Sequence, residues 1–340
     1  MSRKEASRVF SPYFVKYHSR LYREKGYLKC ILNFVGWWSE LLDVEGKDIL
    51  DVGCGFGVYS LFFSFFGAKH VYGADHNQEK HDLFMKILSM MEPPIKNVSL
   101  SLQDGHKLRF SDGRFPIIFI KDVISHVREL DQFLDEVSRI LKPGGRILIT
   151  DENNALDIFG RKARRQIWLS AEERGVKKED LRAIDQPKTF YEMRREDISG
   201  YLAERDLSSL PGVKKIVPGY RGDKKDHEIV LDRLARLTQG LYGDQLIEGT
   251  DQILETGELR IEPVFLYRHP RSGDFSEREF NPFWVARELG KHNIQAKVIR
   301  PFYSTQKPIL NTIGRMIRVT HPLSIIVQPN FYILGTKKLS

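Results

Sequence analysis

The stretch that decides the fold is ILDVGCGFG at residues 49–57. Two apolar residues lead into Asp51, and glycines then occupy every second position, at Gly53, Gly55 and Gly57. Glycine adopts left-handed backbone conformations without steric cost and lets a ligand approach the backbone closely. We therefore predict a buried strand that ends in a tight turn, followed by a helix whose N-terminus faces a nucleotide-like ligand.

The glycine spacing and the acid together distinguish two classes of ligand. A dinucleotide-binding turn has its third glycine at the position that is Val58 here. A carboxylate would repel a pyrophosphate group, whereas it suits a positively charged ligand. S-adenosylmethionine has a sulfonium and an ammonium group and no pyrophosphate, so the stretch favours it as the cofactor. The residues of this turn that we expect to contact it are Asp51, Gly53, Cys54, Gly55 and Gly57.

Outward from this turn, short apolar runs alternate with helical stretches as far as Thr150. The predicted strands cover residues 48–52, 70–74, 97–102, 115–121 and 145–150. The predicted helices between them cover residues 58–66, 78–91 and 130–141. The last of these strands follows a predicted Lys-Pro-Gly-Gly turn at 142–145. Strands that alternate with helices in this way are typical of right-handed βαβ units and a parallel sheet.

Beyond Asn154 the alternation stops, and strand signals return only at residues 294–302 and 330–337. The segment between is too long and too rich in helical patterns to be a loop. We therefore expect an α/β fold, a Rossmann-like, doubly wound, mostly parallel seven-stranded sheet, with a large, mainly helical insertion between strands five and six. The expected parts are N-terminal helices at 1–46, a cofactor-binding core at 47–154, an inserted cap or substrate domain at 155–280 and the C-terminal part of the core sheet at 281–340.

Acids follow the later strands as well. Asp75 could accept both ribose hydroxyls as a bidentate pair, or it could cap the next helix. Asp104 could accept a hydrogen bond from the adenine amino group, or it could be a simple turn residue. With their neighbours, the expected cofactor contacts at these strand ends are Asp75, His76, Asn77, Asp104, Gly105 and Asp122.

These motifs resemble those of the class I S-adenosylmethionine-dependent methyltransferase superfamily, especially its small-molecule, quinone-methyltransferase-like branch. The family's first motif matches residues 51–57, its ribose-binding acid matches Asp75, and its adenine-side acid matches Asp104. The resemblance implies a Rossmann-like methyltransferase that binds S-adenosylmethionine. It is silent on the methyl acceptor.

Two further regions extend the resemblance. Residues 117–127 are similar to the family's fourth-strand region, which often has an acid and a nearby histidine, and RILKPGGR at 139–146 matches its motif after the next helix. The resemblance covers residues 47–152 well and 283–338 loosely, and it does not extend to the cap. The chain departs from the family at Lys121, because the position before the acid is more often uncharged.

Methyl transfer is an in-line displacement at a methyl group that the cofactor has already activated. Holding the acceptor in line can supply roughly 7–11 kcal/mol of barrier reduction, and a base helps only where the acceptor must lose a proton. His126 is the candidate base or acceptor ligand, with a structural histidine as the alternative. Glu152 is a second catalytic candidate, and Asn153 and Asn154 are candidate contacts to acceptor hydroxyls. A turn or a helix cap would also explain these polar residues.

Composition narrows the class of protein. Of the 340 residues, 41% are hydrophobic and 29% are charged, as in a soluble globular protein. The two cysteines and ten histidines form neither a disulfide framework nor a metal-ligand pattern, so we expect no metal. The first residues are polar and charged, without the apolar segment of a signal peptide, and we expect a cytoplasmic protein.

The net charge of +8 is concentrated at both ends of the chain. Residues 292–340 contain seven Lys and Arg side chains and no acid, and residues 1–30 are also basic. Such ends could attract an anionic substrate, nucleic acid or lipid headgroups. Peripheral membrane contact would then involve aromatic residues of the N-terminal helices, namely Phe34, Trp37 and Trp38.

We therefore expect a methyltransferase that acts on a small-molecule, glycan or lipid-linked acceptor, at oxygen or carbon. A large cap suits an enclosed substrate, and the polar exit of the fifth strand suits a hydroxylated one. An RNA methyltransferase is the first alternative because of the basic ends, and a non-catalytic cofactor-binding protein is the second. Within the cap, aromatic and arginine side chains mix at 190–195 and 267–271, where they could recognise phosphate, carboxylate or sugar groups.

Overall fold

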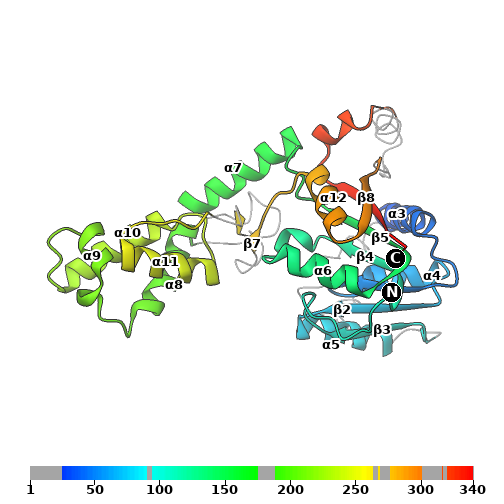
Figure 1. The fold of residues 1–340 in the computed structure, drawn as a ribbon, viewed down its shortest axis with the longest axis horizontal. Coiled ribbons are helices and arrows are strands. Elements are labelled where there is room, and N and C mark those ends of the chain that lie inside the picture. The colour runs from blue at the N-terminus through cyan, green and yellow to red at the C-terminus, as the bar shows by residue number, and fades with distance from the viewer. Residues whose placement is uncertain are drawn as a thin grey trace. The chain divides into compact units, whose positions relative to one another are not determined.

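A computed structural model describes residues 25–89, 94–174, 188–262, 267–268, 276–300, 316 and 320–339 of the chain. The chain divides into two compact units, of which the first comprises Met1–Arg161 with Phe280–Ser340 and the second comprises Lys162–Glu279 (Figure 1). The second unit falls within the insertion predicted at 155–280. Most of the N-terminal segment predicted to be helical lies outside the described residues, which begin there with α3, Lys25–Leu42.

The first unit is built on a seven-stranded sheet with the order β3-β2-β1-β4-β5-β9-β8 (Figure 1). Neighbouring strands from β1 to β5 pair in parallel, whereas β9 is antiparallel to both β5 and β8. The predicted doubly wound, mostly parallel sheet is therefore confirmed. The bounds of its strands are β1 Asp48–Val52, β2 His70–Asp75, β3 Val98–Leu102, β4 Phe115–Lys121, β5 Leu141–Asp151, β8 Ile294–Val298 and β9 Phe331–Lys337.

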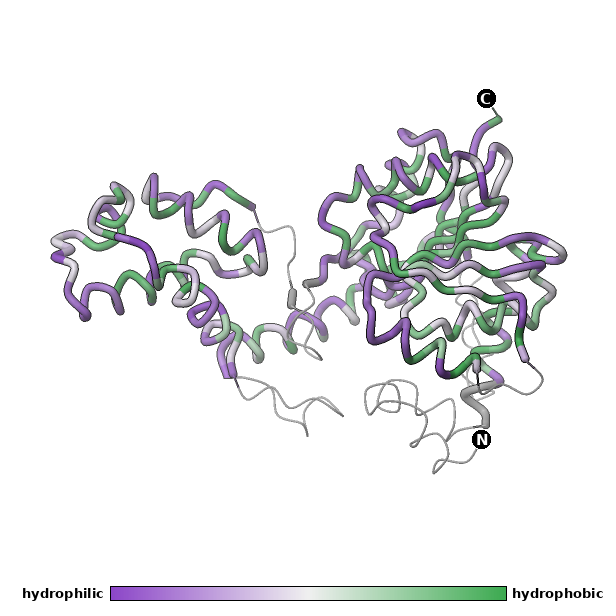
Figure 2. The backbone as a smooth tube through the Cα atoms, turned by 90° about the horizontal axis from the view of Figure 1, so that it is seen from below, coloured by the Kyte–Doolittle hydropathy of each residue, from purple (hydrophilic) through white to green (hydrophobic). Residues whose placement is uncertain are grey.

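Helices cover both faces of this sheet. On one face lie α3, α4 (Val58–Phe65) and α5 (Gln78–Ser89), and on the other lie α6 (Leu130–Ile140) and α12 (Pro282–Lys291). The strands between them are mostly apolar (Figure 2). In β4, Ile117 and Phe119 pack on the first face and Ile118 and Ile120 on the second, which explains the continuous apolar run of a strand buried on both sides.

Helix α3 contributes its aromatic residues to this core. Trp38 is buried, and its ring lies 5.1 Å from that of Phe119 in β4. Trp37 packs edge-on against Tyr332 of β9 at the same centroid distance. The ring of Trp38 thus packs in the core and holds α3 against the sheet, while peripheral membrane contact by the N-terminal segment stays a prediction.

Strand β5 begins earlier than the sequence predicts. Leu141 already pairs with Phe115 of β4, and the register shifts before Ile117 pairs with Arg146. The Lys-Pro-Gly-Gly segment at 142–145 was predicted as a turn that precedes the strand. It is instead part of the strand, in the stretch where the register with β4 shifts, because the extra residues can be accommodated as an irregularity in the ladder.

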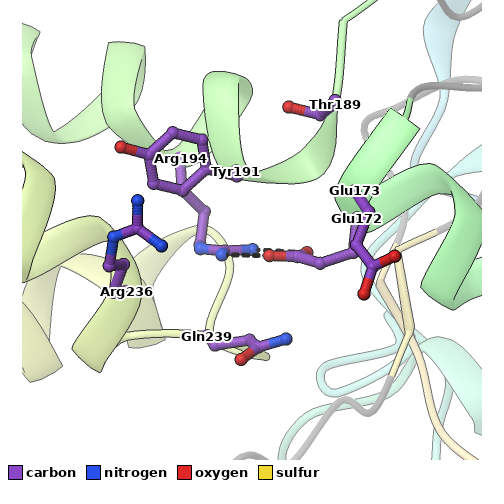
Figure 3. Close-up of a pocket in the computed structure, with 7 residues that line it drawn as sticks. All are labelled: Glu172, Glu173, Thr189, Tyr191, Arg194, Arg236 and Gln239. Carbon is purple, nitrogen blue, oxygen red and sulfur yellow. Dashed lines mark hydrogen bonds and ion pairs between the residues drawn. The ribbon is translucent and has the colours of Figure 1, made fainter.

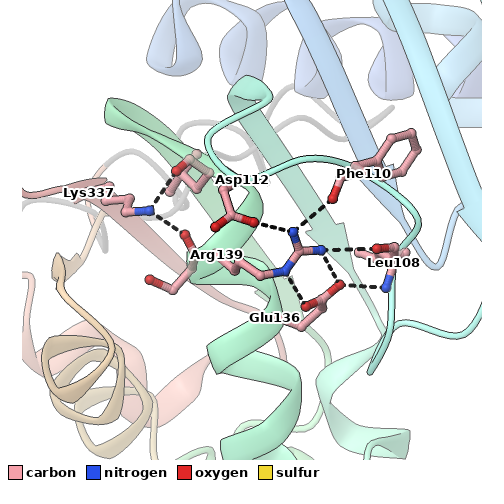
Figure 4. Close-up of polar contacts among 8 residues, drawn as sticks. Leu108, Phe110, Asp112, Glu136, Arg139 and Lys337 are labelled. Atoms are coloured by element: carbon pink, nitrogen blue, oxygen red, sulfur yellow. Dashed lines mark hydrogen bonds and ion pairs between the residues drawn. The ribbon is translucent and has the colours of Figure 1, made fainter.

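Arg139, near the end of α6, fixes the segment between β3 and β4 (Figure 4). Its guanidinium donates hydrogen bonds to the carbonyls of Leu108, at 3.0 Å, and Phe110, at 2.8 Å. It also binds the carboxylates of Asp112 and Glu136, and Glu136 accepts the backbone N–H of Leu108. The first residue of the RILKPGGR motif thus has a structural role.

The second unit is mainly helical and has an apolar core of its own, which includes Ile198, Val230, Leu234 and Ile253. Helix α8 begins with a capping box, in which Thr189 and Glu192 bond to each other's backbone N–H. The elements that have not yet been named are α7 Ile158–Arg174, α8 Phe190–Leu202, α9 Pro211–Ile216, α10 Lys224–Leu237, α11 Asp244–Thr256, β6 Tyr267–Arg268, β7 Ser276–Glu277 and the short 3-10 helices Ile124–His126, Leu207–Ser209 and Leu323–Val327.

Candidate active site

The glycine loop after β1 has the geometry that the sequence predicts. Gly53, Gly55 and Gly57 have φ values of 68°, 55° and 66°, all in the left-handed region. A Cβ atom on Gly53 would lie 2.3 Å from Val123, and one on Gly57 would lie 2.6 Å from the ring of Phe84. A Cβ atom on Gly55 would meet nothing within 4 Å. The outer glycines are thus required for packing, whereas the middle one borders open space that a ligand can fill.

Asp75, the last residue of β2, binds the glycine loop through its carboxylate. Its Oδ2 accepts the backbone N–H of Gly55 at 2.8 Å, and its Oδ1 accepts that of Asn77 at 2.9 Å. Each carboxylate oxygen can accept one more hydrogen bond, which fits the two hydroxyls of a ribose. The cap of α5 is Asn77, whose Oδ1 accepts the N–H of Lys80 at 2.9 Å, so the alternative of Asp75 as a helix cap is not needed. His76 lies beside it and is exposed.

Asp51 lies beneath the loop and is buried. Its Oδ2 accepts the hydroxyl of Ser60 in α4 at 2.6 Å, which ties the first turns of that helix to β1. Burial raises the pKa of Asp51 to about 7, against the hydrogen bond from Ser60, and the negative charge of Asp75 raises it further. A cationic ligand at the loop would favour the ionised form of Asp51, so this acid fits a sulfonium cofactor.

The other residues expected at the cofactor have varied surroundings. Cys54 is buried, and burial raises the pKa of its thiol, so it packs as a neutral side chain. Asp104 is exposed, and its Oδ1 accepts both the backbone N–H, at 2.9 Å, and the ring N–H of His106, at 2.8 Å. These bonds lower the pKa of Asp104 and match a turn aspartate. A Cβ atom on Gly105 would press against the ring of Phe133 at 2.9 Å.

A second acidic and basic cluster lies at the ends of β4 and β5. Asp122 has a left-handed φ of 53° and forms an ion pair with Lys121. Burial opposes the charge of Lys121, but Asp122 and the phenol oxygen of Tyr59 raise its pKa above the usual value. Asp151 is completely buried, and burial, helped by the charge of Asp122, raises its pKa to about 7.

Two backbone N–H groups bind the carboxylate of Asp151 in this cluster. This carboxylate accepts the N–H of Asn153 at 2.9 Å and that of Ser125 at 3.2 Å. The exit of β5 is thereby tied to the 3-10 helix that ends at His126, which is half-buried. Glu152 is exposed at this exit, and its charge contributes to the raised pKa of Lys121.

Asn153 and Asn154, predicted to contact acceptor hydroxyls, are both buried. The side-chain amide of Asn154 donates to the carbonyls of Ile325, at 2.8 Å, and Gln328, at 2.7 Å, while its Oδ1 accepts the N–H of Leu156 at 3.0 Å. Asn154 therefore anchors the segment before β9. The structure brings Lys121, Asp122, Asp151 and Glu152 together, and the amide of Asn154 is turned toward that segment.

Sequence reasoning noted Lys121 as a departure from the family and assigned it no role. Its ammonium lies 5.5 Å from the ring centroid of Tyr59, and its charge also influences Tyr332. The signal that could have identified it is a lone charged residue at the end of an otherwise apolar strand. Among the described residues there is no cluster of His, Cys, Asp or Glu suited to a metal ion. Nor does any helix in the described ranges have the length and apolar character needed to cross a bilayer.

The second unit contains a separate pocket of about 400 Å³ (Figure 3). Arg194, completely buried, binds both oxygens of Glu172 and donates from Nε to the carbonyl of Ala235 at 3.1 Å. The hydroxyl of Tyr191 binds Asp232. The aromatic and basic residues noted at 190–195 thus mainly join helices α7, α8 and α10. In the stretch 267–271, residues 269–271 lie outside the described residues.

Comparison with known proteins identifies the core. Residues 50–149 match a family model described as a methyltransferase domain. The chain is 34% identical over 121 residues to a mitochondrial ubiquinone biosynthesis O-methyltransferase of Dictyostelium discoideum, an alignment that covers 33% of this chain and 37% of the relative. It is 29% identical over 105 residues to phosphoethanolamine N-methyltransferase 2 of Caenorhabditis elegans, covering 31% of this chain and 24% of that one.

A longer alignment involves a tRNA U34 carboxymethyltransferase of Hahella chejuensis, at 26% identity over 196 residues, which covers 53% of this chain and 60% of the relative. The chain therefore spans less than two thirds of the length of each of these relatives. The match covers most of strands β1 to β5, the glycine loop, Asp75 at the end of β2 and Asp122 after β4. Residues 50–149 are a methyltransferase domain of the class I superfamily, whose cofactor is S-adenosylmethionine.

Proposed function

We propose that this chain transfers the methyl group of S-adenosylmethionine to a small-molecule acceptor, at oxygen or carbon. The observation that carries the proposal is the carboxylate of Asp75, which is held by the N–H groups of Gly55 and Asn77 at the edge of the open space beside Gly55. That arrangement offers two acceptor positions to a ribose. The buried acid Asp51 adds negative charge under the same loop.

When bound, the cofactor supplies an activated methyl group, so the protein has mainly to orient the two reactants. In such a site, Asp75 would hold the ribose, and the glycine loop would contact the amino-acid part of the ligand through its backbone. The acceptor would lie over the ends of β4 and β5, beside Lys121, His126 and Glu152. Orientation of this kind can lower a barrier by roughly 7–11 kcal/mol.

The acceptor class follows from the polar groups at this edge. Glu152 is exposed at this edge, where its carboxylate could accept a hydrogen bond from a hydroxyl group of the substrate. His126 is the candidate base. The relative from Dictyostelium discoideum is by name an O-methyltransferase of ubiquinone biosynthesis, which supports oxygen as the atom that is methylated. A glycan or a lipid-linked acceptor fits the same polar edge.

RNA is the second candidate substrate. It is favoured by the alignment with a tRNA-modifying enzyme over 53% of the chain and by the absence of acids from residues 292–340. RNA binding through basic side chains weakens steeply as salt is raised, because counterions are released on binding. Affinity for a mixed tRNA sample at two salt concentrations would separate the two candidates, since a small-molecule site shows little salt dependence.

The main experiment is calorimetry with S-adenosylmethionine and S-adenosylhomocysteine on the full chain, followed by assays for S-adenosylhomocysteine release with phenols, sugars, lipids and tRNA. We expect binding of both cofactor forms and release with one acceptor class. Absence of any binding heat to the folded protein would reject the proposal. Binding without release in any acceptor class would instead favour the non-catalytic alternative.

A further inference from the structure

A row of polar side chains crosses the sheet beside the glycine loop. Lys121 of β4 pairs in register with Thr150 of β5, and Thr150 pairs with Tyr332 of β9. Side chains in register on neighbouring strands project from the same face of a sheet. On the other side of β4, Val52 ends β1 opposite Ile120. The row is therefore level with the start of the glycine loop, at the ends of β4 and β5 where the proposed function places the acceptor.

Lys121 carries its charge in a mostly buried place, where desolvation opposes a cation. Only 18% of its side chain is exposed, and its ammonium lies 5.5 Å from the ring of Tyr59, in the first turn of α4. A helix N-terminus has partial positive charge, and taking an ammonium out of water costs several kcal/mol. A methionine or leucine would fill the same volume at lower cost, so packing alone does not explain the lysine.

The ion pair with Asp122 does not explain it either. Asp122 adopts a left-handed φ of 53°, a conformation that is uncommon for residues other than glycine and that gathers at functional sites. Its Oδ1 is buried and, within the described part of the chain, has no hydrogen-bond partner. Because the side chain of Asp122 is 36% exposed, the ion pair adds only modest stability. Burial raises the pKa of Tyr332 to about 12, so that phenol stays neutral and leaves the positive charge of Lys121 in place.

On the basis of the proposed function, we propose that Lys121 binds the reacting oxygen of the acceptor as an anion, and that the acceptor is therefore a phenol or an enol. An ammonium in a partly buried site stabilises an oxyanion, and the hydroxyl proton passes to solvent water before the transfer. The oxyanion then attacks the methyl carbon. The oxygen–carbon bond forms as the carbon–sulfur bond breaks, and the electron pair of that bond remains on sulfur.

The same charge selects against other acceptors. A protonated amine would be repelled by the ammonium of Lys121, and an aliphatic alcohol is too weak an acid for one nearby cation to ionise. Thr150 and Tyr332 extend the row, but both side chains are buried, so Lys121 is the member of the row that is placed to meet the acceptor. The acceptor class is thus set by Lys121.

The test uses the full chain saturated with S-adenosylhomocysteine and 4-nitrophenol as the probe, because the ionised and neutral forms of nitrophenol differ in absorbance. We expect the bound phenol to titrate with a pKa at least about one unit lower than in free solution. Lys121→Met and Lys121→Gln should abolish that shift, and Lys121→Arg should retain part of it. Lys47→Met, which removes an ion-paired lysine just before β1, is the matched control and should keep the full shift.

Calorimetry with S-adenosylhomocysteine separates this inference from the proposed function. Unchanged cofactor affinity together with loss of the shift in the neutral variants supports the role of Lys121. The inference is overturned by an unshifted bound phenol in the wild type, by the same shift in Lys121→Met, or by a wild type that binds the cofactor and no nitrophenol. A wild-type protein that does not bind the cofactor overturns both this inference and the proposed function. If neither neutral variant folds, the Lys121→Arg variant provides the test. Arginine moves the positive charge, so the pKa shift of the bound phenol must change if Lys121 contacts it. A shift identical to that of the wild type refutes the contact.

Discussion

Asp75 accepts the backbone N–H of Gly55 at 2.8 Å, so a carboxylate at the end of β2 holds the middle of the loop that follows β1. Its other oxygen accepts the N–H of Asn77. Both oxygens are thus fixed in position before any ligand arrives, and each retains the capacity for one more hydrogen bond. The side chain serves the loop and the candidate ribose site together.

Replacing this carboxylate should weaken cofactor binding. In Asp75→Asn one oxygen becomes an NH2 group, which cannot accept a backbone N–H and would oppose either Gly55 or Asn77. We expect the Kd for S-adenosylhomocysteine, measured by calorimetry, to rise by about 10–100-fold, or roughly 1.4–2.7 kcal/mol. Asp82→Asn in α5 removes an exposed carboxylate and is the control. Equal affinities of the two variants would exclude Asp75 from the ligand site.

The glycine loop offers a pair of substitutions with opposite expected effects. Gly57→Ala combines a left-handed residue with a Cβ atom 2.6 Å from the ring of Phe84, so it should destabilise the fold by about 2–5 kcal/mol. Gly55→Ala has the same backbone strain and no clash, so its loss should be only about 1–2 kcal/mol. Urea unfolding measures both values.

Cofactor binding should reverse the order of the two glycine variants. The new methyl group of Gly55→Ala would occupy the open space beside the loop, and we expect its affinity for S-adenosylhomocysteine to fall more than about tenfold. The Gly57→Ala protein that remains folded should lose less affinity for S-adenosylhomocysteine. Affinity of Gly55→Ala equal to that of the wild type would mean that the ligand does not approach the loop there.

Asp51 should make the ligand-free protein less stable as pH rises. Burial raises its pKa from 3.8 to about 7, so the folded state holds a proton that the unfolded state has already lost between these values. Stability therefore falls as pH increases from about 4 to about 7 and is constant above that range. Asp51→Asn keeps a hydrogen-bond acceptor for Ser60 and removes the titrating group. The free energy of unfolding should therefore rise by on the order of 2–4 kcal/mol at pH 8 and by less at pH 5.

Urea unfolding of both proteins at pH 5 and pH 8 measures this difference. Asp151 has a similarly raised pKa, so the stability curve of Asp51→Asn should keep part of the wild-type slope with pH. A gain in stability that is equal at the two pH values would contradict a protonated Asp51 in the folded state. Asp82→Asn, at an exposed position, should show no such dependence.

The parts of the fold that sequence predicts well are those with local causes. The strands β1 and β4 are buried on both faces and therefore read as continuous apolar runs. The glycine loop could be predicted because its backbone needs left-handed conformations at three positions. Asp75 could be predicted because it ends a strand that neighbours β1 in a parallel sheet.

The parts that sequence misses depend on distant segments. The row that contains Lys121 and Tyr332 is created by β9, which enters the sheet antiparallel after the long insertion, and no local pattern specifies that register. The burial of Trp38 depends on Phe119, far along the chain. Asn154 was read as a polar residue at a strand exit, but its amide pairs with carbonyls of Ile325 and Gln328.

Arg139 should be worth more to stability than its surface position suggests. It donates hydrogen bonds to two backbone carbonyls and two carboxylates that hold the segment before β4 (Figure 4). A lysine has one nitrogen on a flexible stem and cannot reach all four partners. We expect Arg139→Lys to lose about 1–3 kcal/mol in urea unfolding with unchanged affinity for S-adenosylhomocysteine, because no contact with the glycine loop is involved.

Arg146→Lys is the matched control at the other end of the same motif, since within the described ranges the Arg146 side chain makes one hydrogen bond, to the carbonyl of Leu41 at 3.1 Å. Its loss should be below about 0.5 kcal/mol. Because Glu136 also accepts the N–H of Leu108, Glu136→Gln combined with Arg139→Lys should lose less than the sum of the two single changes. Equal losses for the two arginine variants, or strict additivity with Glu136→Gln, would mean that the network does not act as a unit.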